Sequence, residues 1–589
     1  MMRVEQVWSK LIGKESRKLL LLSLLVGVLA GFASVLLHFL IHWIKHALTN
    51  WFPSSSYNML YLLYPGIGML LAFLFVRYIV KDNIGHGVTK VLVAVSKNES
   101  QIKAHNTWSS LISSAVTIGF GGSVGAEAPI VYTGAAIGSN VAKFFGLSYK
   151  GMTILLGCGA SAAVAATFKA PLAGVLFTLE ILLFNISMSS MMPLLVATVS
   201  ATVVSYIFIG SSTPFACTIT PFDMKNIPWY LMLGIFCGFC SLYFTRMTLK
   251  LEDNIGKMKN PYAKWGICAA LLGLLIYLFP PLYGEGYDSL GVLLNGGVVD
   301  LEGQTILSFL LNSQWGVPVF FALILILKVF SMTMTNAGGG VGGTFGPTLF
   351  VGAIAGFVLA RTMNLFLGAS GLSLPEQNFV LVGMAGLMAG VMQAPMTAIF
   401  LIAEISGGYD LFMPLIIVSA MSFGTTRIFE KYSIYTKRIA MTGELLTHDS
   451  DQAVLTLLHT KDFVETDYSP VEIDATLGEF VKVISSSTRN TFPVIDSKGR
   501  YQGYVGLEAV RKMMFRTDKY DTMHVYNFMS SSPFYITPDE SMESVMNKFE
   551  VSGRGHLPVV DQERHYLGFI CKANLLGSYR QELKEITGD

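Results

Sequence analysis

Long apolar runs dominate the first three-quarters of this 589-residue sequence. A helix needs about 20 apolar residues to cross the roughly 30 Å hydrocarbon core of a bilayer. Several runs reach that length, and others are shorter or are cut by glycine and proline. The runs are 19–48, 59–80, 107–120, 130–147, 152–184, 191–209, 229–245, 265–278, 317–334, 348–363, 379–402 and 411–423. Short, glycine-interrupted apolar segments are typical of discontinuous helices that end near the bilayer centre and build a site there.

Charge is distributed unevenly and separates a membrane part from a soluble tail. Hydrophobic residues make up 52% of the chain and charged residues only 14%, a balance that excludes an ordinary soluble enzyme. More than half of the Asp and Glu residues follow residue 441, so the last quarter is mildly acidic. We therefore expect a membrane domain over 1–440 and a linker over 441–461. The Lys and Arg residues before the first apolar run place the N-terminus in the cytoplasm.

The sequence contains no pattern typical of a metal site, a catalytic site or a nucleic-acid surface. Cys237 and Cys240 form a C-x-x-C inside an apolar run, without a second pair or a nearby His, which predicts buried small hydrophobes. There is no H-E-x-x-H, no Ser/His/Asp grouping and no phosphate-binding G-x-x-x-x-G-K-[ST] motif. A basic patch interleaved with aromatic residues is also missing. We therefore expect neither an enzyme nor a nucleic-acid partner.

One carboxylate stands out because it lies in the apolar part of the chain, between a glycine-rich turn and a proline. Glu127 belongs to the stretch G-F-G-G-S-V-G-A-E-A-P-I-V-Y-T-G-A-A-I-G, residues 119–138. A charge in such surroundings is costly unless it lines an aqueous path or meets a partner. Glycines before a helix let backbone N–H groups converge, and the helix dipole adds positive potential there. The stretch predicts an anion-accepting cradle that contains a movable anion of its own, which is the arrangement of a gate.

Two glycine-rich blocks recur about 220 residues later at the same internal spacing. The first block has Gly125, Pro129, Gly134 and Gly138, and its copy has Gly343, Pro347, Gly352 and Gly356. The second block has Gly159, Ala170-Pro171 and Glu180, and its copy has Gly383, Ala394-Pro395 and Glu404. The membrane part therefore consists of two homologous halves, and such halves commonly enclose the substrate path between them. Spacing alone does not show whether the halves are inverted.

Other charged residues of the apolar part have simpler interpretations. Glu180 and Glu404 each end a long apolar stretch and are expected to be helix-end carboxylates bonded to backbone or to a loop cation. The acid-bearing segments 287–300 and 407–410 are expected to be plain loops. Lys169 and Lys328 either raise the local potential for an anion or extend to the surface, and the sequence leaves both readings open.

At this point the sequence resembles a known family. G-S-V-G-A-E-A-P at 122–129, G-G-T-F-G-P-T-L-F-V-G at 342–352 and A-P-L-A-G with its following Glu180 resemble the signature segments of the CLC chloride channels and proton-coupled chloride transporters. The resemblance covers essentially the whole chain. It implies an all-α polytopic membrane protein with two inverted repeats, about 1–220 and 221–440, and discontinuous helices. It also implies a homodimer in the plasma (inner) membrane, with one chloride pathway in each subunit.

The resemblance assigns roles to individual residues. Glu127 matches the gating glutamate, whose carboxylate occupies an anion site and swings away to open it. Phe345 matches the residue whose backbone N–H helps bind the central anion, and Tyr435 matches the tyrosine whose hydroxyl coordinates that anion from the inner side. An interfacial tyrosine is the alternative for Tyr435. The full set of implied anion contacts is His86, Gly87, Gly125, Ala126, Thr344, Phe345 and Tyr435. Dipoles of this kind hold an anion without the excessive binding that a full Lys or Arg charge would cause.

The first departure from the family pattern is His86. The family usually has a serine between two glycines here, whereas this chain has G-H-G-V-T at 85–89. A neutral imidazole N–H could donate to the anion in place of the serine hydroxyl, and a protonated ring would bind the anion more tightly at acid pH. Alternatively, the ring turns away and only the backbone N–H remains, which is the interpretation we favour.

The second departure is Ile181. Proton-coupled members usually carry an inner glutamate directly after the residue that matches Glu180, and this position is Ile181 here. An isoleucine cannot carry a proton, and channel members typically have an aliphatic residue there. We therefore favour passive anion conduction. A chloride/proton antiporter is the alternative, because water wires or another carboxylate can replace the inner acid.

The soluble tail contains a second internal repeat. N-T-F-P-V-I-D at 490–496 and G-H-L-P-V-V-D at 555–561 are each preceded by an amphipathic helical stretch and followed by a further strand. The pattern resembles a tandem pair of α/β CBS domains, 462–520 and 524–585, which family members carry on the cytoplasmic side. Such pairs often bind adenine nucleotides, but the usual Ser/Thr-x-x-Asp after the last strand is missing from both copies. We therefore expect a structural or dimerising role rather than nucleotide binding, and no other cofactor.

Overall fold

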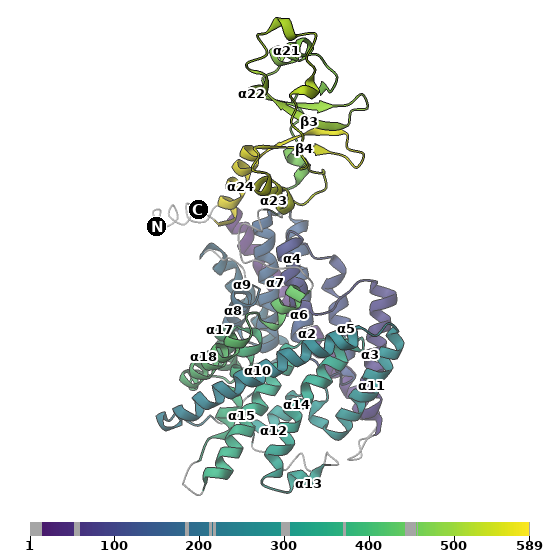
Figure 1. Ribbon diagram of the computed structural model, residues 1–589. Coiled ribbons are helices and arrows are strands. Elements are labelled where there is room, and N and C mark those ends of the chain that lie inside the picture. The colour runs from purple at the N-terminus through teal and green to yellow at the C-terminus, as the bar shows by residue number, and fades with distance from the viewer. Residues whose placement is uncertain are drawn as a thin grey trace, which may run out of the picture. The chain divides into compact units, whose positions relative to one another are not determined.

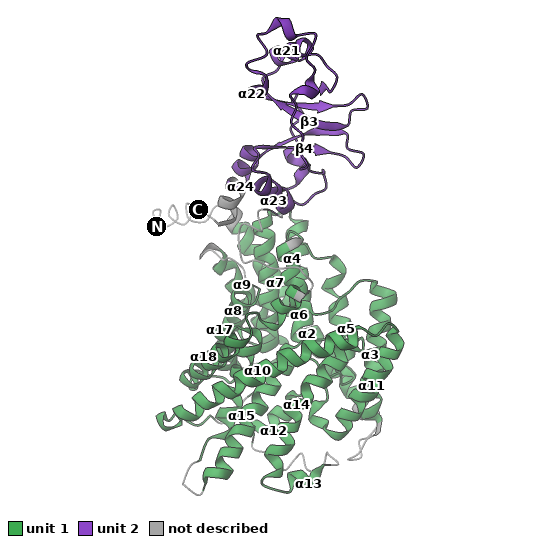
Figure 2. Ribbon diagram, viewed as in Figure 1, with its two compact units in different colours: residues 1–446 green, residues 447–589 purple. Residues whose placement is uncertain are grey.

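The chain folds into two compact units, residues 1–446 and residues 447–589 (Figure 2). This computed structural model describes residues 14–51, 59–182, 188–210, 215, 219–295, 307–368, 373–441, 455 and 458–587. Most of the predicted linker, 441–461, lies outside the described residues.

The described residues of the first unit form helices and loops (Figure 1). Its first half contains α2 (Lys14–Trp51), α3 (Tyr64–Leu74), α4 (Gly87–Lys97), α5 (Ser109–Gly119), α6 (Glu127–Phe144), α7 (Tyr149–Phe168), α8 (Pro171–Glu180) and α9 (Met188–Ile209). The rest contains α10 (Ile227–Gly256), α11 (Pro261–Leu278), α12 (Tyr287–Leu294), α13 (Ser308–Leu311), α14 (Gly316–Ala337), α15 (Phe345–Leu367), α16 (Glu376–Met392), α17 (Pro395–Ile405), α18 (Phe412–Phe429) and α19 (Ile434–Met441).

Helices of two lengths make up this unit. Among the described residues, nine helices are long and apolar enough to cross a membrane. Five further apolar helices, of 10–17 residues, are α4, α5, α8, α16 and α17. A helix of about ten residues rises only about 15 Å, half of the hydrocarbon core, so it cannot cross the membrane alone. The predicted all-α membrane protein with discontinuous helices is therefore confirmed.

The same helix packing occurs in both halves. The helix α2 packs against α7 and α9, and α10 packs against α16 and α18 in the same way. A Cβ on Gly134 of α6 would lie 2.2 Å from the carbonyl oxygen of Gly159 in α7, and a Cβ on Gly352 of α15 would lie 2.5 Å from that of Gly383 in α16. Small residues permit this close approach of helix backbones. The two halves that the glycine spacing predicts therefore pack their helices in the same way.

Helix-end carboxylates show that the two halves are inverted. Glu180, at the end of α8, accepts hydrogen bonds from the backbone N–H groups of Met396 (3.0 Å) and Thr397 (2.7 Å), at the start of α17. Glu404 of α17 in turn accepts from the first N–H groups of α8, at 3.2 and 2.9 Å. Because equivalent residues exchange these bonds, α8 and α17 are antiparallel and a local two-fold axis relates them. The expectation of helix-end carboxylates bonded to backbone is confirmed for both residues.

The glycine crossings give a direct stability prediction. A Cβ on Gly159 would lie 1.9 Å from the carbonyl oxygen of Gly134, so Gly159→Ala must push α6 and α7 apart. We expect a loss of about 1–3 kcal/mol of folding free energy, seen as a lower thermal unfolding midpoint of the detergent-purified protein. Gly266→Ala in α11 is the control, because nothing lies within 4 Å of a Cβ there. Equal midpoints for the two variants would contradict the close crossing.

One loop expectation is wrong. Residues 287–294 form the short helix α12, with Gly286 before it in a left-handed conformation (φ 89°). A Cβ on Gly286 would lie 2.5 Å from the ring of Phe350, so only glycine fits between this turn and α15. The sequence gives little warning, because an eight-residue helix has too few turns for its periodicity to be recognised. Residues 296–300 of the same segment lie outside the described residues.

The second unit repeats one small α/β motif. Its elements are β1 (Val471–Glu472), α21 (Leu477–Ser486), β2 (Thr491–Ile495), β3 (Tyr501–Gly506), α22 (Leu507–Val510), α23 (Met542–Ser552), β4 (His556–Val560), β5 (Tyr566–Cys571) and α24 (Lys572–Thr587). In the first copy β1 pairs in parallel with β2, which pairs antiparallel with β3. In the second copy Ile536 pairs in parallel with Val559 of β4, which is antiparallel to β5. Each copy has its own hydrophobic core.

The two copies of this motif contact each other through their hairpins. Arg500 and His565, which occupy the same position in the two copies, form an antiparallel bridge. The backbone N–H of Tyr501 donates to the carbonyl of Arg564 at 2.9 Å, and that of Tyr566 donates to the carbonyl of Gly499 at 3.1 Å. The rings of Tyr501 and Tyr566 stack with centroids 6.2 Å apart. The tail is therefore a pair of similar domains related by a local two-fold axis.

Candidate functional site

The starts of three helices meet in the interior of the first unit, and Tyr435 of α19 lies beside them. The helix α4 begins at Gly87, α6 at Glu127 and α15 at Phe345. A Cβ on Gly87 would lie 2.4 Å from the carbonyl oxygen of Ala128, so the starts of α4 and α6 are in close contact. Helix starts carry free N–H groups and a positive potential. Their convergence favours an anion without placing a full positive charge beside it.

The two signature loops join the starts of α6 and α15 directly. The backbone N–H of Gly125 donates to the carbonyl of Gly343 at 3.1 Å, and that of Gly343 donates to the carbonyl of Gly125 at 2.7 Å. These glycines are equivalent in the two halves, so the local two-fold axis passes between them. A Cβ on Gly125 would lie 2.9 Å from the backbone nitrogen of Gly346 and 2.1 Å from Oε2 of Glu127. Only glycine leaves room here for the Glu127 carboxylate.

The Glu127 side chain lies in the cradle formed by these loops. It is 2% exposed, and its Oε2 accepts a hydrogen bond from the backbone N–H of Gly346 at 3.2 Å. The hydroxyl of Tyr287, the first residue of α12, donates to Oε1. No Lys or Arg of the described part of the chain forms an ion pair with this carboxylate. The buried Glu127 carboxylate group is thus held by an N–H donor of α15 and an O–H donor of α12.

Three of the other anion contacts expected from the sequence, Thr344, Phe345 and Tyr435, lie at the start of α15 and on α19. Tyr435 and Thr344 are buried, and the Tyr435 hydroxyl lies 3.5 Å from Thr344 Oγ1. Phe345 packs its ring against Phe168, with ring centroids 5.5 Å apart. Its backbone N–H belongs to the first turn of α15, where N–H groups have no partner within the helix. The structure brings these residues to the cradle, and their roles toward an anion stay predictions.

The His86 ring lies beside an ion pair. Its Nε2 is 3.6 Å from Oε1 of Glu252, near the end of α10. Glu252 accepts two hydrogen bonds from Arg438 of α19, at 2.6 and 3.2 Å. This position favours the interpretation in which the ring turns toward protein partners and leaves the backbone as the anion contact. The Glu252–Arg438 pair was not expected from the sequence, because its residues are 186 positions apart.

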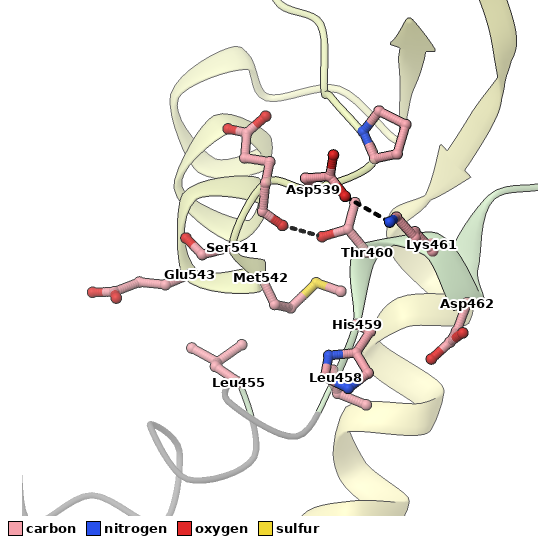
Figure 3. A pocket seen from close by; sticks show the side chains of 12 residues that line it. Leu455, Leu458, His459, Thr460, Lys461, Asp462, Asp539, Ser541, Met542 and Glu543 are labelled. Carbon is pink, nitrogen blue, oxygen red and sulfur yellow. Dashed lines mark hydrogen bonds and ion pairs between the residues drawn. The ribbon is translucent and has the colours of Figure 1, made fainter. Parts of the chain in front are cut away.

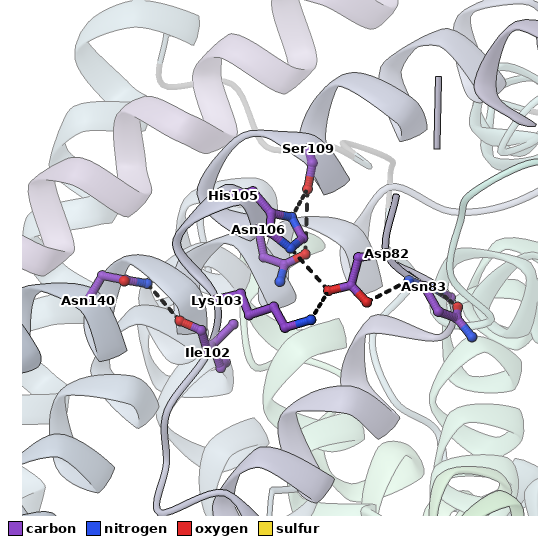
Figure 4. A network of polar contacts seen from close by, with 9 residues as sticks. Asp82, Asn83, Ile102, Lys103, His105, Asn106, Ser109 and Asn140 are labelled. Atoms are coloured by element: carbon purple, nitrogen blue, oxygen red, sulfur yellow. Dashed lines mark hydrogen bonds and ion pairs between the residues drawn. The ribbon is translucent and has the colours of Figure 1, made fainter. Parts of the chain in front are cut away.

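A polar network fixes the loop that leads to His86 (Figure 4). Asp82 accepts hydrogen bonds from Lys103 Nζ at 2.8 Å and from the backbone N–H of Asn83 at 2.9 Å, and its Oδ2 lies 3.1 Å from His105 Nε2. The Asn83 side chain accepts the N–H of Gly85 at 2.9 Å. These bonds hold the chain immediately before α4 against the segment before α5. The start of α4 is thereby positioned at the cradle.

Ile181, the position without an inner acid, is buried in the main hydrophobic core. Its neighbour Glu180 is fully occupied as the cap of α17, with the Thr397 hydroxyl as a further donor at 2.7 Å. Neither residue supplies a free carboxylate at this place.

Sequence reasoning missed the residues that approach Glu127 from the α12 side. Glu285 lies in the loop between α11 and α12, and Tyr287 is the first residue of α12, 160 positions after Glu127. Glu285 is half-buried, and its Oε1 accepts the backbone N–H of Ala126 at 3.0 Å. Ala126 was itself an expected anion contact. The available signal was the segment G-E-G-Y at 284–287, in which two glycines flank an acid between apolar runs.

Lys328 lies beneath this loop. Its side chain is fully buried. The interpretation in which Lys328 extends to the surface is therefore wrong. The ammonium donates to Ser123 Oγ at 2.9 Å and to the carbonyl of Gly284 at 3.0 Å, and it lies 4.8 Å from the ring centre of Phe350. It links the first signature loop to the G-E-G-Y segment.

A cavity in the second unit is a separate feature (Figure 3). It has a volume of about 540 Å³ and is lined by Leu455, Leu458, His459, Thr460, Lys461, Asp462, Pro538, Asp539, Glu540, Ser541, Met542 and Glu543. Lys461 pairs with Asp539 at 2.6 Å. The acidic residues of the lining are Asp462, Asp539, Glu540 and Glu543.

Comparison with known proteins matches both units. The family profile described as "Voltage gated chloride channel" matches residues 67–427, and the CBS domain profile matches residues 525–580. A "Putative chloride channel protein ClcB-like" of Ralstonia nicotianae is 27% identical over 387 residues, which cover 64% of this chain and 85% of that protein. An "H(+)/Cl(-) exchange transporter ClcA" of Vibrio cholerae is 26% identical over 420 residues, which cover 68% and 84%.

A solved structure has the same fold. It is described as "X-ray crystal structure of a slow cyanobacterial Cl-/H+ antiporter", and it matches with a TM-score of 0.62 and 22% identity. The match covers 72% of this chain and 97% of that one.

Proposed function

This chain belongs to the voltage-gated chloride channel family, and we propose that it moves chloride or a similar small anion across a membrane through a pathway gated by Glu127. The observation that carries this proposal is the place of the Glu127 carboxylate. It is buried on the Gly346 N–H, where the signature loops of the two inverted halves join. An anion at that place would use the same donors.

Gating follows from the charge of this carboxylate. While it is ionised, it holds the N–H and O–H donors and repels a second anion. Protonation weakens both interactions, so the side chain leaves and an anion takes its place. Anion flux should therefore rise as the pH falls. On the other side of the gate, the Phe345 N–H and the Tyr435 hydroxyl would receive the anion.

We assign passive conduction as the leading mode because of Ile181. The side chain is buried among apolar neighbours and cannot carry a proton to Glu127. Proton-coupled exchange is the second candidate, and the names of the Vibrio cholerae relative and of the cyanobacterial structure favour it. The Glu252–His86 pair supplies titratable groups on the Tyr435 side that could replace the inner acid.

A proton gradient separates the two modes. In proteoliposomes with equal chloride on both sides and a difference of two pH units, passive conduction predicts a reversal potential at zero. Coupled exchange predicts a reversal potential that is displaced from zero, because anions then cross in one direction in a fixed ratio to protons that cross in the other. Protein-free liposomes and Glu127→Gln protein are the controls, since neither has a coupled proton step. A stable displacement would contradict the channel assignment and support the antiporter.

The cellular setting follows from the same proposal. We place the protein in the plasma (inner) membrane as a homodimer, as the family resemblance implies. Basic residues precede the first span, so we place the N-terminus in the cytoplasm, and the second unit on the same side. The α12 side of the gate then faces outward. The α4 and α12 labels lie toward opposite ends of the first unit in Figure 1.

A further inference from the structure

The α12 side of the gate carries a second carboxylate on a second N–H donor. Glu285 Oε1 accepts the Ala126 N–H at 3.0 Å, and Glu127 Oε2 accepts the Gly346 N–H at 3.2 Å. The two donors belong to the joined signature loops of the two halves. The Ala126 N–H and the Gly346 N–H are therefore each taken by a carboxylate of the protein itself.

The loop that carries Glu285 is fixed, so this contact is part of the built structure. The Gly284 N–H donates to the carbonyl of Gly121 at 3.1 Å, and the Ser123 hydroxyl donates to the carbonyl of Leu282 at 2.6 Å. Lys328 binds the Ser123 hydroxyl and the Gly284 carbonyl together. Residue Glu285 is of intermediate burial, so it is not sealed from solvent.

The charges around Glu285 favour a shared proton. The groups that act on it are Glu127 of α6, Tyr287 of α12, Lys328 of α14 and, at longer range, Lys45 of α2. One buried cation beside two carboxylates leaves an excess negative charge unless one acid is protonated. Burial and the Glu127 carboxylate accordingly raise the pKa of the Glu285 carboxyl, which lies in a loop between the membrane-spanning segments.

We propose that Glu285 is a second gating carboxylate, which occupies the Ala126 N–H as an internal anion and must be protonated or displaced before a permeating anion takes that donor. The inference rests on the proposed function, because it assigns a further residue to the same pathway. A gating role for Glu285 differs from a structural role in its dependence on pH. A structural acid would support the loop at every pH, whereas a gating acid makes anion binding depend on its own titration.

The test uses the Glu127→Gln background, in which the first gate no longer titrates. Chloride binding by calorimetry and chloride efflux from proteoliposomes are measured between pH 4 and pH 8. We expect chloride affinity and efflux to fall as the pH rises, by about tenfold in affinity, because a carboxylate beside the anion costs about 1.4 kcal/mol or more. In the double variant E127Q/E285Q both should become independent of pH, since the Gln oxygen still accepts the Ala126 N–H without a charge.

The matched control is E127Q/D288N. Asp288 lies in the same short segment, but its side chain is 82% exposed and pairs with Lys45 at the surface. This control should keep the pH dependence of E127Q. If E127Q is already independent of pH, or if E127Q/E285Q keeps the dependence, the inference about Glu285 is overturned while Glu127 gating stands. If E127Q remains as strongly gated as the wild type, the proposed function itself fails. The E127Q measurement decides the first point even if the double variant does not fold.

Discussion

Replacing Glu127 by glutamine is expected to leave the anion pathway open at alkaline pH, where the wild-type pathway is closed. In the wild type, each pH unit above the titration of the gate reduces the open fraction about tenfold. Glutamine has nearly the same shape but cannot ionise, so the steep part of this dependence disappears. At a pH two units above the wild-type midpoint, the chloride efflux of the variant should exceed that of the wild type by about 100-fold.

The control for this substitution is Glu376→Gln. Glu376 is also the first residue of an apolar helix, α16, but it pairs with Arg361 at 3.3 Å and lies outside the cradle. Its variant should keep the wild-type pH profile. If the Glu127→Gln protein closes at alkaline pH like the wild type, Glu127 is not the gate.

Removing the Tyr287 hydroxyl is expected to open the pathway at higher pH. This hydroxyl donates to Glu127 Oε1 and stabilises the ionised carboxylate. A hydrogen bond to a charged group is worth about 1.5–3 kcal/mol, and one pH unit corresponds to about 1.4 kcal/mol. In Tyr287→Phe the gate should therefore take up its proton more readily, and the midpoint of the flux–pH curve should move about one to two units to the alkaline side.

Tyr283→Phe is the matched control for Tyr287→Phe. Tyr283 lies in the same connection, with its ring 5.1 Å from that of Tyr61, and it makes no contact with Glu127 among the hydrogen bonds of the described residues. Its variant should keep the wild-type midpoint. An unchanged or acid-shifted midpoint in Tyr287→Phe would show that the hydroxyl does not hold the closed gate.

The duplicated architecture could be predicted from the sequence because its constraints are local. Helices that touch at backbone distance need glycine at fixed spacing, so Gly134, Gly159 and their copies mark the crossings in the sequence itself. Glu180 and Glu404 likewise end apolar stretches at equivalent positions. The direction of the second half was not available from spacing, because the same spacing serves parallel and inverted repeats. The reciprocal bonds of these two glutamates supply that information.

The surroundings of Glu127 could be predicted only in part. Its own loop predicts an anion cradle, since glycine and a helix start are adjacent in the sequence. Tyr287 and Glu285 come from the start of α12 and the loop before it. This segment reaches the site through the packing of α12 on α15 and through bonds of the loop to Gly121 and Ser123. Lys328 shows the same limit, because a lysine in an apolar helix is compatible with burial and with surface exposure. Only the polar partners that the fold brings to its ammonium decide between them.

The central claim is that the Glu127 carboxylate and a permeating anion compete for the same N–H donors. An experimental structure of Glu127→Gln protein in bromide, with anomalous scattering, tests this claim most directly. We predict a bromide peak within hydrogen-bond distance of the Gly346 nitrogen in the variant, and no peak there in the wild type at alkaline pH. A variant without bromide at this nitrogen, or a wild type that holds bromide there beside an unmoved Glu127 carboxylate, would contradict the claim.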